Sequence, residues 1–580
     1  MDDARTTSLA NDRVYYCGLR DWIEKVDDLG ELLRIVDASW DAEMGSITQM
    51  MTEKSRGNAP ALLFDKIPGY PEGFRTLYGS LSSVQRVALT LGLPLEQERK
   101  VDIVKRYYDR MQDLQLIPPK IVDSGPVMEN IQTGDEIDVL KFPVPRHHEK
   151  DKARYIGTAN CVISKDPDNG SYNLGTYRNQ VYDAKTIGCQ ITEGKHGRIH
   201  RDKYFERGEE CKFVILVGED PLLYMLSASP LPEGVCELEF AGGLRGEAIE
   251  CIKGPYTGFP IPADAEIAIE GVTRPGQVKQ EGPFGEWMGY YSDDSVPRPY
   301  VEIKTILHRN DPIICCAPQH KPVDETGLLK GIAGSAEIWR ALEASGIPDI
   351  KGVWNHEGGP ATRFTTIQIK QRYPGHARNV LHIASSCQGG AYAGKWTVVV
   401  DEDIDAGDLD QVLWAMSTRF DPMTDVDLGP LARKDLREDI QDQVERAVAD
   451  GAEILTGGAI PDGTGYYYPP TVLGGVEAGT VAFTDRVVGE VSEDVSTSVG
   501  DFVLKRRDGV YAYQLAVVVD DLAMGVTEVV RGMDLLDSTA RQIRLIEALG
   551  GTPPTYAHLP LLVGADGRHV RERVAQRVPH

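Results

Sequence analysis

Two glutamates five residues apart, in the segment Glu281-Gly-Pro-Phe-Gly-Glu286, are candidates for acid–base chemistry. The two glycines and the proline between them oppose a regular helix, so we expect a turn that brings both carboxyl groups together. In a partly dry site two neighbouring carboxylates repel each other, so one keeps its proton and can donate it while the other stays ionised. A solvated turn without a function is the alternative that this spacing leaves open.

An amide, an imidazole and a third carboxylate form a second candidate group. Asn173 and Arg178 lie five residues apart on an expected strand, so they share a site only if the strand bulges or ends between them. His196 lies in a flexible cationic turn between glycines, and Glu237 follows a bend rich in proline and glycine. Oxygen ligands with one nitrogen suit Mn²⁺ or Mg²⁺ better than Zn²⁺. A solvated histidine is the alternative, because no spacing rule brings these side chains together.

The elements that must position these residues fall into three regions. Apolar periodicity and short β-branched runs predict a small α/β domain up to about residue 125, with helices over 18–30, 84–91 and 101–114 and strands over 32–36 and 62–64. The sequence of the next region predicts a β domain, which we expect to form a barrel, with strands over 155–164, 172–182, 211–217, 267–272 and 300–308. A third α/β region is predicted from helices over 335–344 and 376–386 and strands over 350–354, 364–370 and 396–400.

Composition limits the class of protein. The chain has 580 residues, too many for one ordinary domain, and its 41% hydrophobic and 26% charged residues are typical of a globular protein. Its 62 Lys and Arg against 88 Asp and Glu give a formal charge of −26, which opposes nucleic-acid binding. We see no signal segment and no apolar run that could span a membrane, and expect a cytoplasmic protein. The nine cysteines lack CxxC spacing, so we expect buried thiols rather than a zinc site or disulfides.

Five motifs in order resemble the UbiD family of reversible decarboxylases, which use prenylated FMN. They are Glu281–Glu286 (EGPFGE), 173–178 (NLGTYR), 194–200 (GKHGRIH), 232–237 (PEGVCE) and 241–246 (AGGLRG). The resemblance covers about residues 20–421 and implies a mixed α/β (α+β) fold. Its parts would be an N-terminal α/β domain (1–125), a split β-barrel of flavin-reductase-like type that holds the flavin (126–310), and a truncated C-terminal α/β domain (311–424).

The resemblance implies a catalytic role for three residues. Arg178 and Glu281 would form an ion pair over the flavin, and Glu286 would be the proton donor. In the implied mechanism the modified flavin adds to an unsaturated acid, the carboxylate leaves as CO₂, and Glu286 delivers the replacing proton.

The resemblance also implies the cofactors and their ligands. Asn173, His196 and Glu237 would bind a divalent metal, Mn²⁺ or Mg²⁺, that bridges to the phosphate of prenylated FMN, and Lys395 would contact that phosphate. K⁺ is a further candidate ion. The complete cofactor-binding set implied is Asn173, Thr176, Tyr177, Arg178, Lys195, His196, Glu237 and Lys395.

After Asp421 the sequence departs from this family. Residues 425–475 resemble a C-terminal piece of an aldehyde dehydrogenase, without a cysteine that could act as nucleophile. Residues 479–567 resemble glutamyl-Q tRNA synthetase without its nucleotide-binding half. We therefore expect two further segments, 425–478 and 479–580, with exposed apolar surface and no complete active site. A natural fusion, an assembly error and an artificial recombination all explain such a tail.

Three functions are open from the sequence. The first is a prenylated-FMN-dependent decarboxylase of an aromatic or α,β-unsaturated carboxylic acid, working in either direction. The second is a flavin-binding but inactive chimera whose truncated third domain no longer closes. The third, a dehydrogenase or aminoacyl-transfer activity of the tail, is opposed by the missing nucleophile and nucleotide-binding half. The expected partners are the acid substrate, a flavin prenyltransferase as cofactor source, and other copies of the chain in a homodimer or a hexamer.

Overall fold

The structure, a computed structural model, describes most of residues 14–559 in two compact units, Met1–Phe420 and Asp421–His580. Within 14–559 the residues outside the description are 56–57, 97–98, 230, 232–233, 292–294, 360–362, 392–393, 422–423, 428–433, 462–467, 470, 476–516, 520, 523–524, 527 and 533–535. The division after Phe420 falls where the family resemblance was expected to end.

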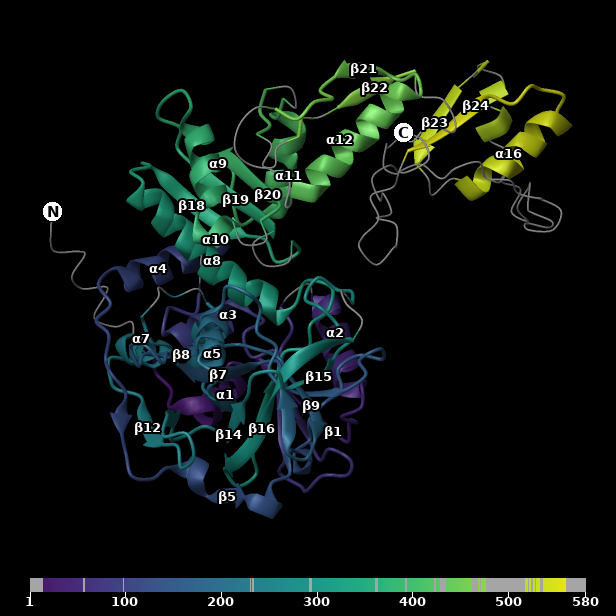
Figure 1. Cartoon of the computed structure of the whole chain (residues 1–580). Helices are drawn as coiled ribbons and strands as arrows, with labels where there is room; N and C mark the ends of the chain where they lie inside the picture. The colour runs from purple at the N-terminus through teal and green to yellow at the C-terminus, as the bar shows by residue number, and fades with distance from the viewer. Residues whose placement is uncertain are drawn as a thin grey trace. The chain divides into compact units, whose positions relative to one another are not determined.

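The N-terminal part contains four helices and a small mixed sheet (Figure 1). The helices are α1 (Gly18–Asp28), α2 (Glu43–Ser55), α3 (Val84–Leu91) and α4 (Lys100–Gln112). The sheet has the order β1 (Leu32–Val36), β2 (Ala61–Asp65), β3 (Arg75–Tyr78), β17 (Ile313–Cys316). Helix α1 buries the apolar stripe that predicted it, Leu19, Trp22, Ile23 and Val26. Strand β17 comes from beyond residue 310 and pairs in parallel with β3, so the chain crosses the boundaries expected between domains.

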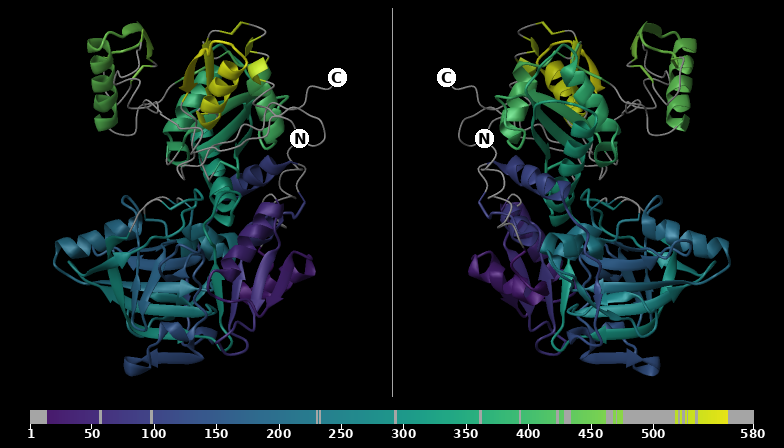
Figure 2. Two further views of the ribbon diagram at one scale, coloured as in Figure 1. Left: turned by 90° about the vertical axis from the view of Figure 1, so that its right-hand side faces the viewer. Right: turned by 90° about the vertical axis from the view of Figure 1, so that its left-hand side faces the viewer.

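The central part is a ten-stranded antiparallel sheet with helices around it (Figure 2). Its main path runs β6 (Arg154–Gly157), β9 (Asn179–Asp183), β10 (Thr186–Gly188), β16 (Val296–His308), β14 (Ile267–Thr273), β11 (Cys211–Val217), β7 (Asn160–Lys165), β8 (Tyr172–Gly175). Strands β5 (Asn130–Thr133) and β15 (Val278–Glu281) pair with β16. The associated helices are α5 (His196–Glu206), α6 (Pro221–Ser227) and α7 (Glu237–Arg245), and a small sheet joins β4 (Lys120–Ile121), β12 (Glu250–Lys253) and β13 (Pro260–Pro262).

The connections between strands require this sheet to curl. Strand β6 lies at one end of the main path and β7 near the other, yet only residues 158–159 join them. Six strand spacings in a flat sheet span about 29 Å, whereas three Cα steps reach at most about 11 Å. Residues 176–178 likewise join β8 at one end to β9 near the other. The two ends of the sheet therefore approach each other, which confirms a curled half-barrel, and residues 176–178 cross its seam.

A third α/β layer follows in the same unit. Its helices are α8 (Glu325–Ala344), α9 (His376–Ser386), α10 (Gln388–Ala391) and α11 (Leu409–Thr418). Its sheet has β19 (Phe364–Ile369) in the centre, antiparallel to β18 (Ile350–Asn355) and parallel to β20 (Trp396–Asp401). Helix α8 contacts both α4 and β18, so the apolar core continues from the N-terminal helices into this layer.

The described residues of the second unit form short elements with few buried apolar side chains. They are α12 (Lys434–Ala449), β21 (Glu453–Thr456) antiparallel to β22 (Val472–Gly474), β23 (Glu528–Gly532) parallel to β24 (Thr555–Leu559), and α16 (Leu536–Ala548). The expected exposed apolar side chains are present among its described residues: Val448, Ile454, Leu455, Ile460, Val519 and Leu549.

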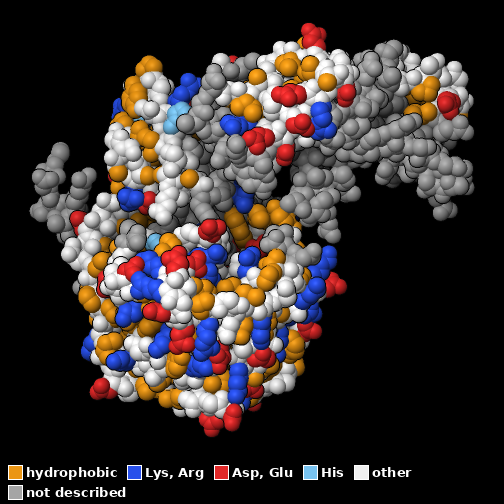
Figure 3. All heavy atoms as spheres, in the orientation of Figure 1, with side chains coloured by type: hydrophobic (Ala, Val, Ile, Leu, Met, Phe, Trp, Pro, Cys, Tyr) orange, Lys and Arg blue, Asp and Glu red, His pale blue; other side chains and the backbone are white. Residues whose placement is uncertain are grey.

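Surface charge and cysteines agree with the composition. On the face of the first unit seen in Figure 3, acidic and basic side chains are interspersed, without a continuous basic area. No described helix has both the length and the apolarity needed to cross a bilayer. All nine cysteines are free thiols; seven are buried, as expected, whereas Cys17 is exposed and Cys387 is half-buried.

Candidate active site

Arg178 binds both carboxylates of the EGPFGE segment. It lies in the connection across the barrel seam, which confirms that a strand ends between Asn173 and Arg178. Its Nε and Nη2 donate to the two carboxylate oxygens of Glu281 at 2.8 Å each, and Nη1 donates to Glu286 Oε1 at 2.5 Å. The segment therefore turns and brings its two acids to one place, and the ion pair expected between Arg178 and Glu281 is present.

The two glutamates differ in their access to solvent. The Glu281 side chain is 2% exposed, whereas those of Glu286 and Arg178 are 18% and 19% exposed. Burial by itself lowers the pKa of Arg178, but the hydrogen bonds and charges of Glu281 and Glu286 outweigh it and raise the pKa above its usual value. Arg178 is thus a permanent cation held by a buried acid, and Glu286 is the acid that a reactant can reach.

Neighbouring polar groups hold the turn in place. The Gly282 N–H donates to Gln180 Oε1 at 2.9 Å, the Gly285 N–H donates to Asp151 Oδ1 at 2.9 Å, and the Tyr155 hydroxyl donates to Glu281 Oε1 at 3.3 Å. Burial raises the pKa of Asp151. Sequence reasoning missed Asp151, Tyr155 and Gln180, because only tertiary packing, and no local pattern, brings them to this turn.

The local geometry favours glycine at both glycine positions of the turn. Gly282 has a φ of +86°, a conformation that favours glycine. A Cβ atom on Gly285 would lie 2.4 Å from His148 Cδ2. The Phe284 ring between them packs 4.2 Å from the Tyr155 ring and 5.1 Å from the Arg178 guanidinium carbon.

The second candidate group assembles where two helices begin beside strand β8. His196 Nδ1 lies 3.2 Å from Asn173 Oδ1, and Glu237 Oε2 accepts a 2.7 Å hydrogen bond from the Leu174 N–H. Burial raises the pKa of Glu237 to about 8. One expectation was wrong: His196 is the first residue of α5 rather than part of a flexible turn. Glu237 likewise begins a helix, α7.

The space beside Asn173 and His196 suits a single ion. A cavity of about 20 Å³ is lined by both residues and by polar neighbours that include Asp166 and His200. This is room for about one water-sized sphere. Among the described residues no three His, Cys, Asp or Glu side chains are placed to hold a metal, so an ion here would need the asparagine oxygen as its third ligand.

The other predicted cofactor residues lie in three places. Thr176 and Tyr177 cross the seam beside Arg178; Thr176 Oγ1 lies 2.8 Å from Ser227 Oγ, and the Tyr177 hydroxyl accepts a 3.1 Å hydrogen bond from the Gly197 N–H. Lys195 directly precedes α5. Lys395 lies in the third layer just before β20, where its N–H donates to the Arg363 carbonyl at 3.2 Å and its side chain is exposed.

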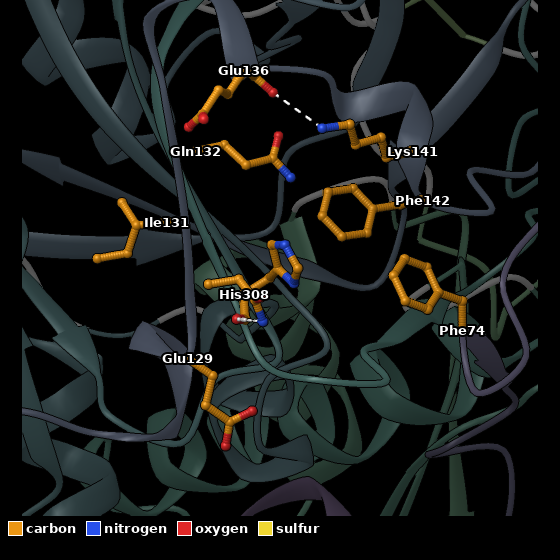
Figure 4. A pocket seen from close by; sticks show the side chains of 9 residues that line it. Phe74, Glu129, Ile131, Gln132, Glu136, Lys141, Phe142 and His308 are labelled. Atoms are coloured by element: carbon orange, nitrogen blue, oxygen red, sulfur yellow. Dashed lines mark hydrogen bonds between the residues drawn. The ribbon is translucent and has the colours of Figure 1, made fainter.

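A larger hollow lies away from these residues. It measures about 530 Å³ and is lined by residues that include Phe74, Gln132, Lys141 and His308 (Figure 4). None of the predicted site residues lines it, so it is separate from the candidate active site.

His147, buried behind the turn with its ring 6.4 Å from that of Phe284, should make stability depend on pH. Burial, and then the charge of His148, lowers the pKa of His147 to about 3. In the unfolded chain this imidazole takes up its proton near about pH 6.5. The contribution of the neutral His147 to the free energy of unfolding is therefore fully present above that pH and is lost as the pH falls toward 3. We expect a loss of about 2 kcal/mol at pH 5 relative to pH 7. Urea unfolding should show this loss in the parent and not in His147→Leu; an equal loss in both would contradict it.

Models of known protein families match successive parts of the chain. Family models described as the N-terminal, Rift-related and C-terminal domains of 3-octaprenyl-4-hydroxybenzoate carboxy-lyase (UbiD) match residues 23–106, 120–322 and 328–439. The last match extends past Asp421. Models of the aldehyde dehydrogenase family and of the class I tRNA synthetase (E and Q) catalytic domain match residues 387–492 and 475–578.

Relatives and solved structures match 70–78% of the chain. A phenolic acid decarboxylase from Escherichia coli O157:H7 is 31% identical over 466 residues, 78% of this chain and 95% of that protein. An evolved dimeric form of the UbiD-class enzyme HmfF from Pelotomaculum thermopropionicum, in complex with prFMN, aligns with a TM-score of 0.64 at 28% identity, covering 71% of this chain and 91% of that one. Vanillic acid decarboxylase from Sedimentibacter hydroxybenzoicus aligns with a TM-score of 0.63 at 28% identity, covering 70% and 86%. The chain belongs to the UbiD family of carboxy-lyases.

Proposed function

We propose that this protein is a prenylated-FMN-dependent carboxy-lyase that reversibly decarboxylates an aromatic or α,β-unsaturated carboxylic acid. The observation that carries the proposal is the single guanidinium of Arg178 bound to one buried and one accessible carboxylate. The prFMN bound in the HmfF structure supports the cofactor, and the phenolic and vanillic acid decarboxylases support the substrate class.

The residues of the turn would divide the work. When bound, the prenylated flavin supplies the electron sink that makes loss of CO₂ from an unsaturated acid feasible. Glu281 holds Arg178, which in turn orients Glu286 through Oε1. We therefore assign the transferred proton to Glu286 Oε2, from which it moves to the carbon that loses its carboxylate.

The cofactor-binding residues keep their predicted roles as part of this proposal. Thr176, Tyr177 and Lys195 are assigned to the flavin and its phosphate, and Lys395 to the phosphate. K⁺ stays a candidate ion without assigned ligands. The test is coexpression with a flavin prenyltransferase, the expected cofactor source. The purified protein should carry a flavin with the mass of prenylated FMN, and a protein that binds no flavin after reconstitution would contradict the proposal.

We assign one divalent cation, Mn²⁺ or Mg²⁺, to Asn173, His196 and Glu237. The contact between Asn173 and His196, the ion-sized cavity beside them and the buried carboxylate nearby fit such an ion. A cation would offset the cost of keeping Glu237 ionised in a buried place.

Removing the imidazole should therefore weaken metal binding. We expect His196→Ala to bind Mn²⁺ at least about 10–100-fold more weakly than the parent, by analogy with the loss of groups that support metal ligands. The exposed His382→Ala on α9 is the matched control and should bind as the parent does. Electron paramagnetic resonance titration measures this, and equal affinities of the two variants would rule out the site.

The proposal also covers the localisation and the assembly of the protein. We propose a cytoplasmic protein that assembles as a homodimer or a hexamer; the HmfF form cited above is described as dimeric. Light scattering during size-exclusion chromatography tests the assembly. We assign no activity to the second unit.

The flavin-binding but inactive chimera is the second candidate. It is favoured by the few buried apolar side chains among the described residues of the second unit and by the division of the chain into two units after Phe420. Such a protein would bind the cofactor and release no CO₂.

A further inference from the structure

A single lysine interrupts the buried start of helix α8. Lys330 lies between Leu329 and Gly331 in a stretch where the residues from Glu325 to Ala336 are otherwise buried. Asp324 caps this helix by accepting a 2.7 Å hydrogen bond from the Gly327 N–H. Lys330 itself is half-buried. A cation at such a place needs a compensating partner, because removing an ammonium group from water is costly.

The side chain of Lys330 extends toward the residue that follows the proposed proton donor. Its Nζ lies 5.7 Å from the centre of the Trp287 ring, and the Arg363 guanidinium carbon lies 5.0 Å from the same ring. Trp287 comes directly after Glu286. In the part of the chain that the structure describes, Lys330 Nζ forms no ion pair or hydrogen bond, so its contact with this ring leaves its donors available.

Two of the charged residues that act on Lys330, Lys195 and Glu286, belong to the candidate site. Burial and the charge of Lys195 lower the pKa of Lys330 to about 8, while the charges of Asp324 and Glu286 act in the opposite direction. At neutral pH the amine is therefore mostly protonated. Lys330 thus presents a cation to the same region as Glu286.

The carboxylate that leaves as CO₂ is a poor candidate for the partner of this cation. An ion pair with the reacting carboxylate would stabilise the ground state, whose charge moves away from that group as CO₂ forms, and so would slow the reaction. Arg178 is already paired with two acids, because three of its five N–H groups donate to Glu281 and Glu286, so its charge is balanced within the protein. A second acidic oxygen on the substrate fits the position of Lys330 better.

We propose that Lys330 binds an acidic oxygen substituent of the substrate, a phenol oxygen or a second carboxylate, separate from the carboxylate that is lost. The assignment rests on the proposed function, because it places the substrate beside Glu286. It makes Lys330 a specificity-determining residue, which selects acids that carry such a substituent over acids that lack it.

The test is binding to the flavin-loaded protein, measured by calorimetry. Two matched pairs of acids are compared: 4-hydroxycinnamate with cinnamate for the phenol, and terephthalate with benzoate for the second carboxylate. We expect the parent to bind the substituted acid of at least one pair about 10–100-fold more tightly, the effect of one hydrogen bond to a charged group. The pair that shows the preference identifies the substituent.

Two variants locate the preference. Lys330→Met keeps an unbranched apolar stem and removes the charged end, so the preference should disappear while binding of the unsubstituted acid stays within about threefold. Lys351→Met, which removes a partly exposed lysine paired with Asp349 in the same layer, should keep the preference. A preference that survives in Lys330→Met overturns the proposal.

The parent alone also decides the question if Lys330→Met does not fold. Equal affinities within both pairs, or no binding of any of the four acids, overturn the assignment. Binding does not require turnover, so the proposed function can fail separately: a preference that depends on Lys330 in a protein that releases no CO₂ would support the site and contradict the decarboxylase.

Discussion

Glu286→Gln should lower the rate of decarboxylation by at least about 10²–10⁴-fold, the usual contribution of a general acid. Glutamine keeps the size of the side chain, and its amide oxygen can still accept the hydrogen bond that Arg178 Nη1 donates at 2.5 Å. It cannot supply a proton to the carbon that loses CO₂. Flavin and metal binding should therefore survive in this variant while the reaction slows.

Uptake of deuterium from D₂O into the product or a product analogue measures this step directly. Glu286→Gln should exchange far more slowly than the parent. Glu302→Gln, at a surface ion-pair cluster on β16, is the control and should exchange normally. Glu281→Gln should also impair turnover, but by leaving the Arg178 guanidinium without its buried partner. Exchange in Glu286→Gln at the rate of the parent would show that another group donates the proton.

Arg178→Met should destabilise the protein by about 3–5 kcal/mol, because it leaves a buried carboxylate without its counter-ion. The Glu281 side chain is 2% exposed and, among the described residues, would keep a hydrogen bond from the Tyr155 hydroxyl at 3.3 Å. Activity should be lost as well, since Arg178 also orients Glu286.

Arg198→Met provides the comparison for this loss. Arg198 pairs with Asp202 one helical turn away, and both side chains are more than 30% exposed, so its removal should cost at most about 1 kcal/mol. The free energies of unfolding of the two variants, from urea titrations, check this difference. Similar values would show that the Arg178 pair contributes no more than a surface contact.

Elements with strong periodicity could be predicted from the sequence nearly to the residue. Strand β1 (Leu32–Val36), helix α3 (Val84–Leu91), strand β11 (Cys211–Val217) and helix α9 (His376–Ser386) have the expected bounds. Each carries a regular apolar pattern between clear breaks, which is the signal that local sequence encodes best. The turn at Glu281–Glu286 was predictable for the same local reason, because glycine and proline oppose a helix there.

Features set by long-range pairing could not be predicted. The expected strands over 155–164 and 172–182 are each two strands, because the chain crosses the barrel seam through only two or three residues between them, and no local pattern marks that crossing. Helix α5 has too few apolar residues on one face to be recognised, so His196 was placed in a turn. Lys330 did leave a signal, a single cation inside the apolar run Leu328–Ile332, that could have marked it as a functional residue.

Release of CO₂ by the flavin-loaded protein, from a panel of aromatic, phenolic and α,β-unsaturated acids in D₂O, tests the central claim most directly. We predict CO₂ in equal amount to a product that carries one deuterium at the former carboxyl position, with at least one acid of the panel. The reaction should be absent without the prenylated flavin and strongly reduced in Glu286→Gln. A protein that holds prenylated FMN and the metal, yet releases no CO₂ and exchanges no ¹³C-labelled bicarbonate into any acid, would contradict the decarboxylase and support the inactive flavin-binding chimera.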